Sequence, residues 1–451
     1  MISYEEYELV EKINKLIEKK DWKKIIKKLA DLPSSDIAYI LENSSKETEL
    51  LLFRLLPKEK AAKVFSKLEV DEQESILRNI GNEKVKQIIL ELPPDDRTEI
   101  FGDLPGNVTQ KLLNILPPAE HKEALSLLCY SEDSVGRIMT PEYIAVRPTW
   151  TIEEALDHIR ELGKDAETIN MVYVVDDRWH LIDSLPIRKF ILANPKENVE
   201  SIMDYKFISI SVYKDQEEAA KKMKKYNLVA LPVVDQEGVL MGIVTIDDIL
   251  DVLEEETTED FHKGAAVSPV GINYTTASPW MLYTKRVMWL SILLVTGFIS
   301  STIVARFKVT LESVIALAFF IPVLIDTGGN TSTQSATLVI RAISTGDLTL
   351  RKWFSVIKKE LLTGLLLGIS IGSIFFLRSF IFRDGIPLAL TLGLSTLSII
   401  IVANIIGAIL PIILTKLKLD PAIISSPLLT TIVDSLGLLI YFYIARLIFN
   451  L

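Results

Sequence analysis

Two acidic residues, Asp326 and Asp434, lie in long stretches of sequence that otherwise carry no charge. An ionised carboxylate near the centre of a bilayer costs at least about 2.5–3.5 kcal/mol, so it survives only where it meets water, a cation or a partner charge. The uncharged stretches hold no basic residue, and the hydroxyls of Ser426 and Thr430 lie one or two helical turns before Asp434. We therefore predict that Asp434 binds a cation on a hydrated path through a membrane.

Asp326 is followed by a polar, glycine-rich segment that includes Gly328, Gly329 and Asn330. Glycines at membrane depth permit close backbone approach and broken helices, which is how ion sites are often built in membranes. The segment therefore predicts an interrupted helix that lines the same path. The alternative is a helix in which the glycines serve packing and Asp326 reaches toward the membrane boundary.

These residues need helices that cross a bilayer, and five stretches are long enough because about 20 residues span the hydrocarbon core. The stretches are 287–305, 313–340, 361–377, 386–415 and 421–445. Five crossings place the termini on opposite sides. With the N-terminal half in the cytosol, nine basic residues flank the inner ends and five flank the outer ends, as the positive-inside rule requires.

Charge is divided unequally along the 451 residues. Thirteen basic and seven acidic residues follow Lys285, so this part carries a net charge of +6 and the part before it −16. An acidic half without a basic stripe argues against nucleic acid and favours cations as partners.

The single cysteine, Cys129, permits no internal disulfide, and the four histidines form no zinc motif. No Gly-x-x-x-x-Gly-Lys-Ser/Thr loop is present, so we expect no enzyme. The acidic N-terminus lacks the features of a secretory signal.

Residues 32–118 show a regular spacing of about twelve positions, in which leucine or isoleucine precedes a turn residue, as at Leu92-Pro93, Leu104-Pro105 and Leu116-Pro117. Short helices that each end at proline or glycine fit this spacing. We predict stacked helical hairpins that form a right-handed solenoid. An irregular helical bundle is the alternative.

A second repeat begins near Met139 and has sequence identity as well as spacing. Glu153-Glu154-Ala155 matches Glu217-Glu218-Ala219, and Val174-Val175-Asp176 matches Val233-Val234-Asp235. Each copy reads as strand, helix, two strands joined by a turn, and helix. The pair resembles tandem cystathionine-β-synthase (CBS) domains.

This resemblance implies an adenine nucleotide, such as ATP, in the cleft between the copies. In the second copy Thr245 and Asp248 match the residues that hold the ribose, whereas the first copy has Ser184 and Lys189. A lysine cannot accept a hydrogen bond from a ribose hydroxyl. The alternative is a dimerisation module that binds no nucleotide.

The membrane half resembles the MgtE magnesium channel family. The resemblance is carried by Thr327-Gly328-Gly329-Asn330-Thr331 and Gln334-Ser335-Ala336-Thr337 in the second span, and by Asp420-Pro421-Ala422 and Gly437-Leu438-Leu439 around Asp434. It implies a homodimer with its pore on the twofold axis, where Asp434 binds hydrated Mg²⁺. Ser426 and Thr430 depart from the family's amide and apolar residue, so Co²⁺, Mn²⁺ and Ni²⁺ are alternative ions.

Eight carboxylates crowd residues 247–260, and at helical spacing several of them share a face and repel one another. The resemblance implies that this stretch is a plug helix whose acids meet other cytosolic acids across bridging Mg²⁺. The matching positions are Asp95, Glu99, Asp248, Asp251, Glu256, Glu259, Asp260 and Asp420. Asn227 replaces an aspartate of the family, which predicts one weaker site. A solvated acidic helix is the alternative.

The sequence thus predicts a multidomain protein, with an all-α repeat domain, an α+β CBS pair and a polytopic α-helical membrane domain. The boundaries are 1–130 for the helical repeat, 131–195 and 196–252 for the CBS domains, 253–280 for the connecting helix and 281–451 for five transmembrane helices. We expect a multi-pass cell-membrane protein with cytoplasmic N-terminal domains and an external C-terminus. The predicted function is a homodimeric magnesium channel closed by cytosolic Mg²⁺. The alternatives are a proton- or sodium-coupled transporter of divalent cations and a membrane-anchored nucleotide sensor.

Overall fold

The computed structural model describes residues 4–19, 21–268, 277–344, 347–348, 353–383, 385–420 and 426–451. Pro421, Ala422 and residues 269–276 of the predicted connector lie outside the described residues. The chain divides into two compact units, Met1–Glu256 and Thr257–Leu451, and each is described by itself.

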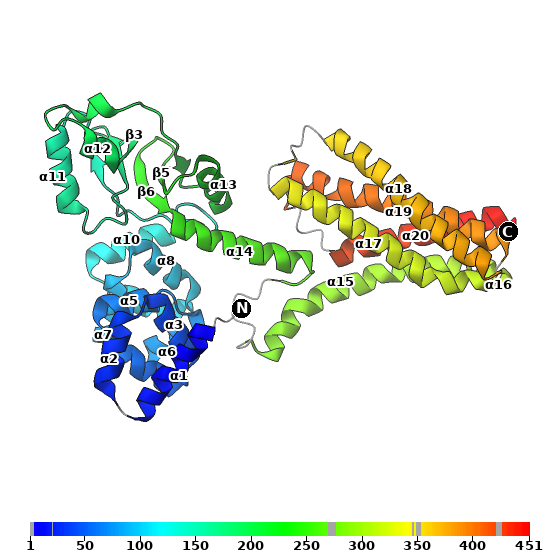
Figure 1. Cartoon of the computed structure of the whole chain (residues 1–451), viewed down its shortest axis with the longest axis horizontal. Coiled ribbons are helices and arrows are strands. Elements are labelled where there is room, and N and C mark those ends of the chain that lie inside the picture. Colours follow the sequence, from blue (N-terminus) through cyan, green and yellow to red (C-terminus); the bar gives the residue numbers. More distant parts are fainter. Residues whose placement is uncertain are drawn as a thin grey trace. The chain divides into compact units, whose positions relative to one another are not determined.

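The first unit begins with ten helices in the described residues (Figure 1). They are α1 (Tyr4–Glu18), α2 (Trp22–Asp31), α3 (Ser34–Glu42), α4 (Lys46–Arg54), α5 (Lys58–Phe65), α6 (Val70–Asn79), α7 (Asn82–Glu91), α8 (Pro94–Asp103), α9 (Gly106–Ile115) and α10 (Pro118–Leu128). Leu92, Leu104 and Leu116 each end a helix in extended conformation, because a residue that precedes proline disfavours the helical region. The predicted short helices that end at proline are confirmed.

The CBS pair completes the first unit with two three-stranded sheets of the same topology. Its elements are β1 (Ala145–Val146), α11 (Ile152–Leu162), β2 (Met171–Val175), β3 (Leu181–Pro186), α12 (Ile187–Leu192), the 3-10 helix η1 (Val199–Ile202), β4 (Ile210–Ser211), α13 (Gln216–Tyr226), β5 (Ala230–Val234), β6 (Leu240–Thr245) and α14 (Ile246–Gly264). The strand orders are β1-β2-β3 and β4-β5-β6, and in each sheet the first pair is parallel and the second antiparallel. The predicted tandem repeat is confirmed.

The two copies pack against each other through the ends of their hairpins. Leu181 N donates to Gly238 O at 3.0 Å, and Leu240 N donates to Trp179 O at 2.9 Å. Tyr173 and Ile243, one from each sheet, are fully buried in the shared apolar core. This fixed arrangement positions the start of α14, which follows directly after β6 and carries all eight of the crowded acids.

The second unit contains the end of α14 and the long C-terminal helices (Figure 1). They are α15 (Pro279–Arg306), α17 (Ala316–Ser344), α18 (Trp353–Ile381), α19 (Ile386–Lys416) and α20 (Ser426–Phe449), with the short α16 (Lys308–Ser313) between the first two. Among the described residues, α15, α18, α19 and α20 are long and apolar enough to cross a membrane. The helix α17 has 29 residues, which is also sufficient length, but polar residues fill its middle.

The predicted interruption of the second membrane helix is wrong. The helix α17 runs without interruption through Gly328 and Gly329, and α20 begins at Ser426, so Pro427 lies in its first turn. Within this segment, Thr327 and Thr331 donate their hydroxyls to carbonyls four residues earlier on the same helix. Proline is well tolerated in a first helical turn, where its missing N–H has no partner to lose.

Candidate functional site

Asp434 is the ninth residue of α20 and faces the glycines of α17. A Cβ placed on Gly329 would lie 3.1 Å from Thr430 Cγ2 and 3.6 Å from Asp434 Oδ1. A Cβ on Gly328 would lie 2.8 Å from Ile399 and 3.2 Å from Val433. The glycines therefore allow α17 to approach α19 and α20 more closely than any other residue would, which brings the polar segment against Asp434.

The polar groups around Asp434 do not neutralise it. Among the described residues, its carboxylate accepts no hydrogen bond and forms no ion pair, although the residue is only half exposed. The Thr430 hydroxyl donates to the Pro427 carbonyl at 2.9 Å instead. Asp326, which accepts from Asn330 Nδ2 at 3.1 Å, adds a second negative charge that acts on Asp434. Such a site can hold a cation and the water bound to it.

Ser426 and Asn330 lie at the borders of this polar face. The Ser426 hydroxyl lies 3.0 Å from the Thr333 hydroxyl and so links α20 to α17. Asn330 is exposed and contacts Asp326. The structure thus brings Gly328, Gly329, Thr430 and Asp434 together, while Asn330 and Asp326 occupy one neighbouring turn of α17.

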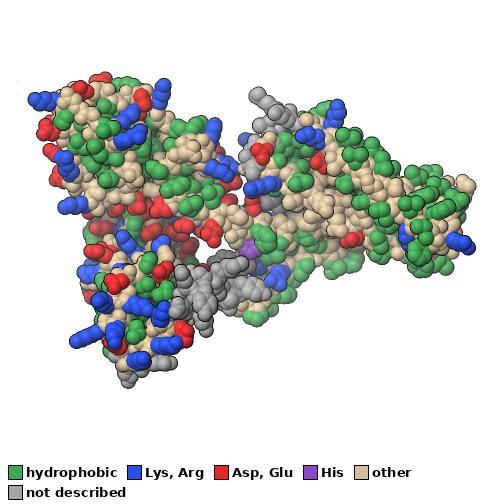
Figure 2. Space-filling view, in the orientation of Figure 1, with side chains coloured by type: hydrophobic (Ala, Val, Ile, Leu, Met, Phe, Trp, Pro, Cys, Tyr) green, Lys and Arg blue, Asp and Glu red, His purple; other side chains and the backbone are tan. Residues whose placement is uncertain are grey.

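An acidic pocket lies in the first unit between the helical domain and the CBS pair, where carboxylates gather in Figure 2. Its volume is about 310 Å³. Nine carboxylates line it, namely Asp95, Asp96, Glu99, Asp103, Glu132, Asp133, Asp248, Asp251 and Glu255. Arg137 is the one cation among its lining residues, and Lys67 lies close enough to act on Asp96 and Asp251. The pocket is therefore strongly negative.

Burial and mutual repulsion raise the pKa values of these carboxyl groups. Burial raises the pKa of Glu99 from 4.5 to about 8, and the charges of Asp103 and Asp96 add to this effect. Burial is also the main reason that the pKa of Asp248 rises to about 6. The pKa of Asp95 is raised well above its usual value by burial and then by Asp248. Each raised pKa means that burial and neighbouring negative charges disfavour the ionised form of the carboxyl group.

Asp95 gives the most direct sign of a missing partner. Only 8% of this residue is exposed, and its Oδ1 has no hydrogen-bond partner within the described chain. No three acidic, histidine or cysteine side chains of the described residues converge closely enough to hold a bare metal ion. An ion that keeps some of its water, as Mg²⁺ usually does, needs fewer direct ligands than a bare ion does.

The structure divides the predicted regulatory residues into two groups. Asp95, Glu99, Asp248 and Asp251 line the pocket, and Glu256 accepts from Gln216, another lining residue, at 3.4 Å. Glu259, Asp260 and Asp420 belong to the second unit. There, Lys263 Nζ lies 2.8 Å from both Glu259 Oε1 and Asp420 Oδ2.

Several pocket residues, among them Asp96, Asp103 and Glu255, were not predicted, because the regulatory positions were taken from the resemblance and not from the spacing of the acids. Asp96 and Asp103 lie on α8 with Asp95 and Glu99, at the three- and four-residue spacing that places them along one side of a helix. The same spacing relates Glu255 to Asp251 on α14. Helical periodicity of acids could therefore have found them.

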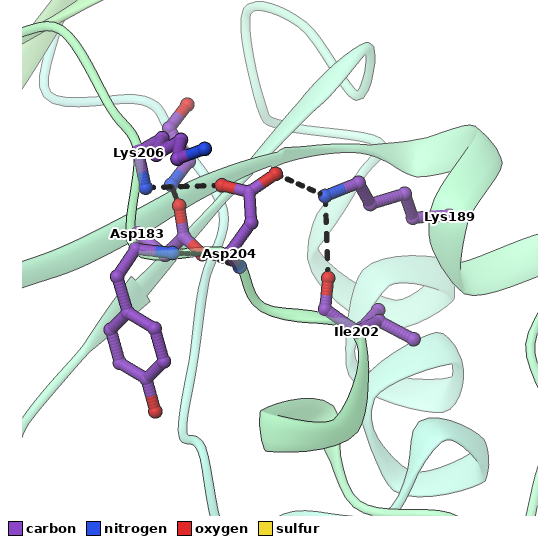
Figure 3. Close-up of polar contacts among 7 residues, drawn as sticks. Asp183, Lys189, Ile202, Asp204 and Lys206 are labelled. Carbon is purple, nitrogen blue, oxygen red and sulfur yellow. Dashed lines mark hydrogen bonds and ion pairs between the residues drawn. The ribbon is translucent and has the colours of Figure 1, made fainter.

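The cleft residues of the CBS pair are already engaged. Thr245 donates through its hydroxyl to Asp248 at 2.6 Å. In the first copy, Lys189 pairs with Asp204 at 2.9 Å and donates to the Ile202 carbonyl at 3.3 Å (Figure 3). The buried Asp183 carboxylate accepts from the backbone N–H groups of Asp204 and Tyr205, both at 2.9 Å. Lys189 is thus held by residues near the start of the second copy.

Comparisons with known proteins agree over the whole chain. Residues 32–133 match the MgtE intracellular N domain, residues 135–193 and 199–255 match CBS domains, and residues 321–444 match the MgtE divalent cation transporter family. The magnesium transporter MgtE of Thermus thermophilus is 43% identical over 98% of this chain and 99% of its own length. The Bacillus subtilis magnesium transporter MgtE is 38% identical, and the alignment covers 72% of each protein.

Solved structures match the first unit. The crystal structure of the cytosolic domain of the Mg²⁺ channel MgtE in complex with ATP has a TM-score of 0.52 and 36% identity, and it covers 54% of this chain and 99% of that one. The soluble part of a magnesium transporter also has a TM-score of 0.52, at 25% identity, over 56% of this chain and 99% of that one. With its helical N domain, CBS pair and apolar C-terminal helices, this chain belongs to the MgtE family of magnesium transporters.

Proposed function

We propose that this chain forms a homodimeric, Mg²⁺-selective channel in the cell membrane, with its N-terminal domains in the cytosol and its C-terminus outside. The observation that carries the proposal is the half-buried Asp434 carboxylate, which has no counter-charge among the described residues and faces the glycines of α17. Two copies of Asp434 around a twofold axis would offer two negative charges to one ion. A divalent ion gains about twice as much from these charges as a monovalent ion does.

Hydrated Mg²⁺ fits this site better than a dehydrated ion. Mg²⁺ gives up its water reluctantly and is usually bound by one or two carboxylates together with retained waters. The backbone at Gly328 and Gly329, the amide of Asn330 and the hydroxyls of Ser426 and Thr430 are the polar groups that would line its path. Inward movement needs no ATP, since the membrane potential contributes about 2.3 kcal/mol per charge per 100 mV.

The acidic pocket supports closure by cytosolic Mg²⁺. Without cations its carboxylates repel one another and favour separation of the helical domain from the CBS pair and α14. Mg²⁺ would bind the compact state more tightly and so shift the population toward it. We assign this role to Asp95, Glu99, Asp248, Asp251 and Glu256, and to the plug residues Glu259, Asp260 and Asp420.

Uptake into proteoliposomes at a clamped potential tests the transport site. Asp434→Asn keeps the shape of the side chain but removes its charge, so we expect Mg²⁺ uptake to fall by at least about tenfold, the factor for about 1.4 kcal/mol of lost ion stabilisation. The control is Glu312→Gln, which neutralises an exposed acid of the same unit. Equal uptake by the wild type and Asp434→Asn would reject Asp434 as a pore residue.

One observation favours a second candidate, a proton- or sodium-coupled transporter. Asp326 and Asp434 lie close enough to influence each other, and two neighbouring carboxylates can exchange a proton for a metal ion. An imposed proton or sodium gradient separates the two functions. A channel carries Mg²⁺ only down the electrochemical gradient of Mg²⁺ itself, whereas a coupled transporter accumulates Mg²⁺ when only the coupling gradient is present.

Nucleotide binding is a further part of the proposal. The relative crystallised with ATP supports an adenine nucleotide in the CBS cleft. In this chain the cleft would use Thr245 and Asp248, and Asp248 also lines the acidic pocket. Nucleotide and Mg²⁺ would then act on the same carboxylate, so ATP should change the Mg²⁺ concentration that closes the channel.

A further inference from the structure

The single carboxylate of α18, Glu360, is held by side chains from two other membrane helices. Asn404 Nδ2 on α19 donates to Glu360 Oε2 at 2.7 Å and to the Glu360 carbonyl oxygen at 2.9 Å. Ser335 Oγ on α17 lies 3.1 Å from the same Oε2 and 3.0 Å from the Asn404 carbonyl oxygen. Glu360, Asn404 and Ser335 thus form one polar node that joins α17, α18 and α19.

The node is buried where polar groups are costly. Asn404 is 3% exposed and Ser335 is 2% exposed. Asn404 is also the only amide side chain in α19, a helix that otherwise consists of apolar residues and small hydroxyls up to its terminal lysine. A buried amide without a partner is destabilising. Glu360 supplies the hydrogen-bond acceptor that the buried Asn404 amide needs. The same carboxylate orients the Ser335 hydroxyl.

Close packing connects the node to the ion path. Gly407 lies one turn beyond Asn404 on α19, and a Cβ there would collide with the Ser332 carbonyl oxygen of α17. Six residues before Ser335, Gly329 packs against Thr430 near Asp434. The helix α17 is therefore enclosed between α19 and α20, and a displacement at Ser335 would move Gly329 relative to Asp434.

We propose that Glu360 is a positioning residue that holds α17 against α19 and thereby sets the spacing between the glycine face of α17 and Asp434. This inference rests on the proposed ion path at Asp434. The carboxylate acts through hydrogen bonds as an acceptor, so its shape and acceptor oxygen matter more than its ability to bind an ion. Glu360→Gln should therefore be tolerated, because its amide oxygen can still accept from Asn404 and Ser335.

Uptake of Mg²⁺ and Co²⁺ by the full-length protein in proteoliposomes tests the role of Glu360. Glu360→Ala should lower the maximal Mg²⁺ rate by about tenfold, the factor expected for the loss of two intramembrane hydrogen bonds of average strength. Glu360→Gln should stay within about twofold of the wild type. The matched control is Lys359→Gln, which neutralises an exposed charge at the adjacent position of α18. A change in the ratio of Co²⁺ to Mg²⁺ uptake should accompany the loss, since reduced folding alone lowers both rates equally.

A second pair of variants, which exchanges the donor at Asn404 and the acceptor at Glu360, tests the proposal even if Glu360→Ala fails to fold. Asn404→Asp places two carboxylates at the 2.7 Å contact and should abolish most uptake. Adding Glu360→Gln restores one donor and one acceptor at this contact, while the hydrogen bond to the carbonyl oxygen of residue 360 stays lost, so the double variant should recover part of the rate. Wild-type rates and ion ratios in Glu360→Ala, or no recovery in the double variant, would overturn the positioning role. Asp434→Asn is measured in parallel, and normal uptake by that variant would reject the path itself and not the role of Glu360.

Discussion

Lys263 and Asp420, which are 157 residues apart in the sequence, form an ion pair of 2.8 Å in the second unit. Lys263 also pairs with Glu259 one turn earlier on α14. The two carboxylates, which the resemblance assigned to a bridging Mg²⁺, therefore share an ammonium group. Burial opposes the charged form of Lys263, but hydrogen bonds to Asp420 and Glu259, together with their charges, raise its pKa, so this group stays protonated at physiological pH. The end of α14 is thus tied to the segment before α20 without a metal ion.

Removal of this ammonium should make the gate more dependent on Mg²⁺. In Lys263→Met, Glu259 and Asp420 repel each other when no cation is present. We expect the open probability at low cytosolic Mg²⁺ to rise about two- to fivefold, as the loss of about 0.5–1 kcal/mol at a partly exposed ion pair implies. Inside-out patch recording measures this directly. Lys418→Gln, at an exposed lysine of the same loop, is the control, and an unchanged open probability in Lys263→Met would contradict the role of the ion pair.

Neutralising Asp95 should stabilise the compact first unit in the absence of Mg²⁺. Asp95→Asn removes a buried charge whose Oδ1 has no partner among the described residues. We expect the Mg²⁺-free Tm of a fragment that ends at residue 268 to rise by about 2–4 °C, the shift for about 1 kcal/mol in a domain of this size. The further rise on addition of Mg²⁺ should be smaller than in the wild type.

The control for this variant is Asp71→Asn. Asp71 is exposed and lies in the first turn of α6, as Asp95 lies in the first turn of α8, so both substitutions remove the same favourable interaction with a helix N-terminus. A lower Mg²⁺-free Tm in Asp95→Asn than in Asp71→Asn would mean that a protein cation already compensates Asp95.

Stability of the same fragment should depend on pH through Glu99. Its pKa is about 8 in the folded unit and about 4.5 in the unfolded chain. Between these values the unfolded chain binds fewer protons, so the free energy of unfolding falls as the pH rises. The stabilisation is complete below about pH 4.5 and lost above about pH 8. Thermal unfolding from pH 5 to 8 without Mg²⁺ should show this decline, and Glu99→Gln should flatten it. A Tm that rises over this range would contradict the assignment.

Two glycines of the membrane unit should respond in opposite ways to alanine. A Cβ at Gly407 would collide with the Ser332 carbonyl oxygen, whereas a Cβ at Gly297 in α15 meets nothing within 4 Å. Gly297→Ala should leave the free energy of unfolding unchanged or raise it by up to about 1 kcal/mol, because alanine reduces the backbone freedom of the unfolded chain. Gly407→Ala should lower the apparent Tm in detergent by several degrees. Equal Tm values for the two variants would mean that α17 and α19 are not packed closely.

Local sequence features predicted most of the fold. Proline after Leu92, Leu104 and Leu116 determines helix ends through local sterics, and the matched Glu-Glu-Ala segments at 153 and 217 place the two CBS helices. The long uncharged stretches correspond to long helices because only helices satisfy the backbone in lipid. These inferences succeed because each depends on residues close together in the chain.

Features that depend on three-dimensional packing could not be predicted in the same way. The close approach of Gly328 to Ile399 and Val433 could not be predicted, because the segment itself does not reveal these neighbours. The Lys263–Asp420 pair joins residues that no local pattern relates. The helical spacing of acids could have identified Asp96 and Asp103. Only the fold shows that α8 faces α14 across the pocket.

Single-channel recording with varied cytosolic Mg²⁺ tests whether this protein is a channel that cytosolic Mg²⁺ closes. We expect discrete unitary currents carried by Mg²⁺ when the cytosolic side is free of Mg²⁺. We also expect a steep fall in open probability, at constant unitary conductance, as cytosolic Mg²⁺ approaches the millimolar range typical of weak oxygen-ligand sites. Currents without unitary steps, or an open probability that does not change with cytosolic Mg²⁺, would contradict a channel that its own transported ion closes.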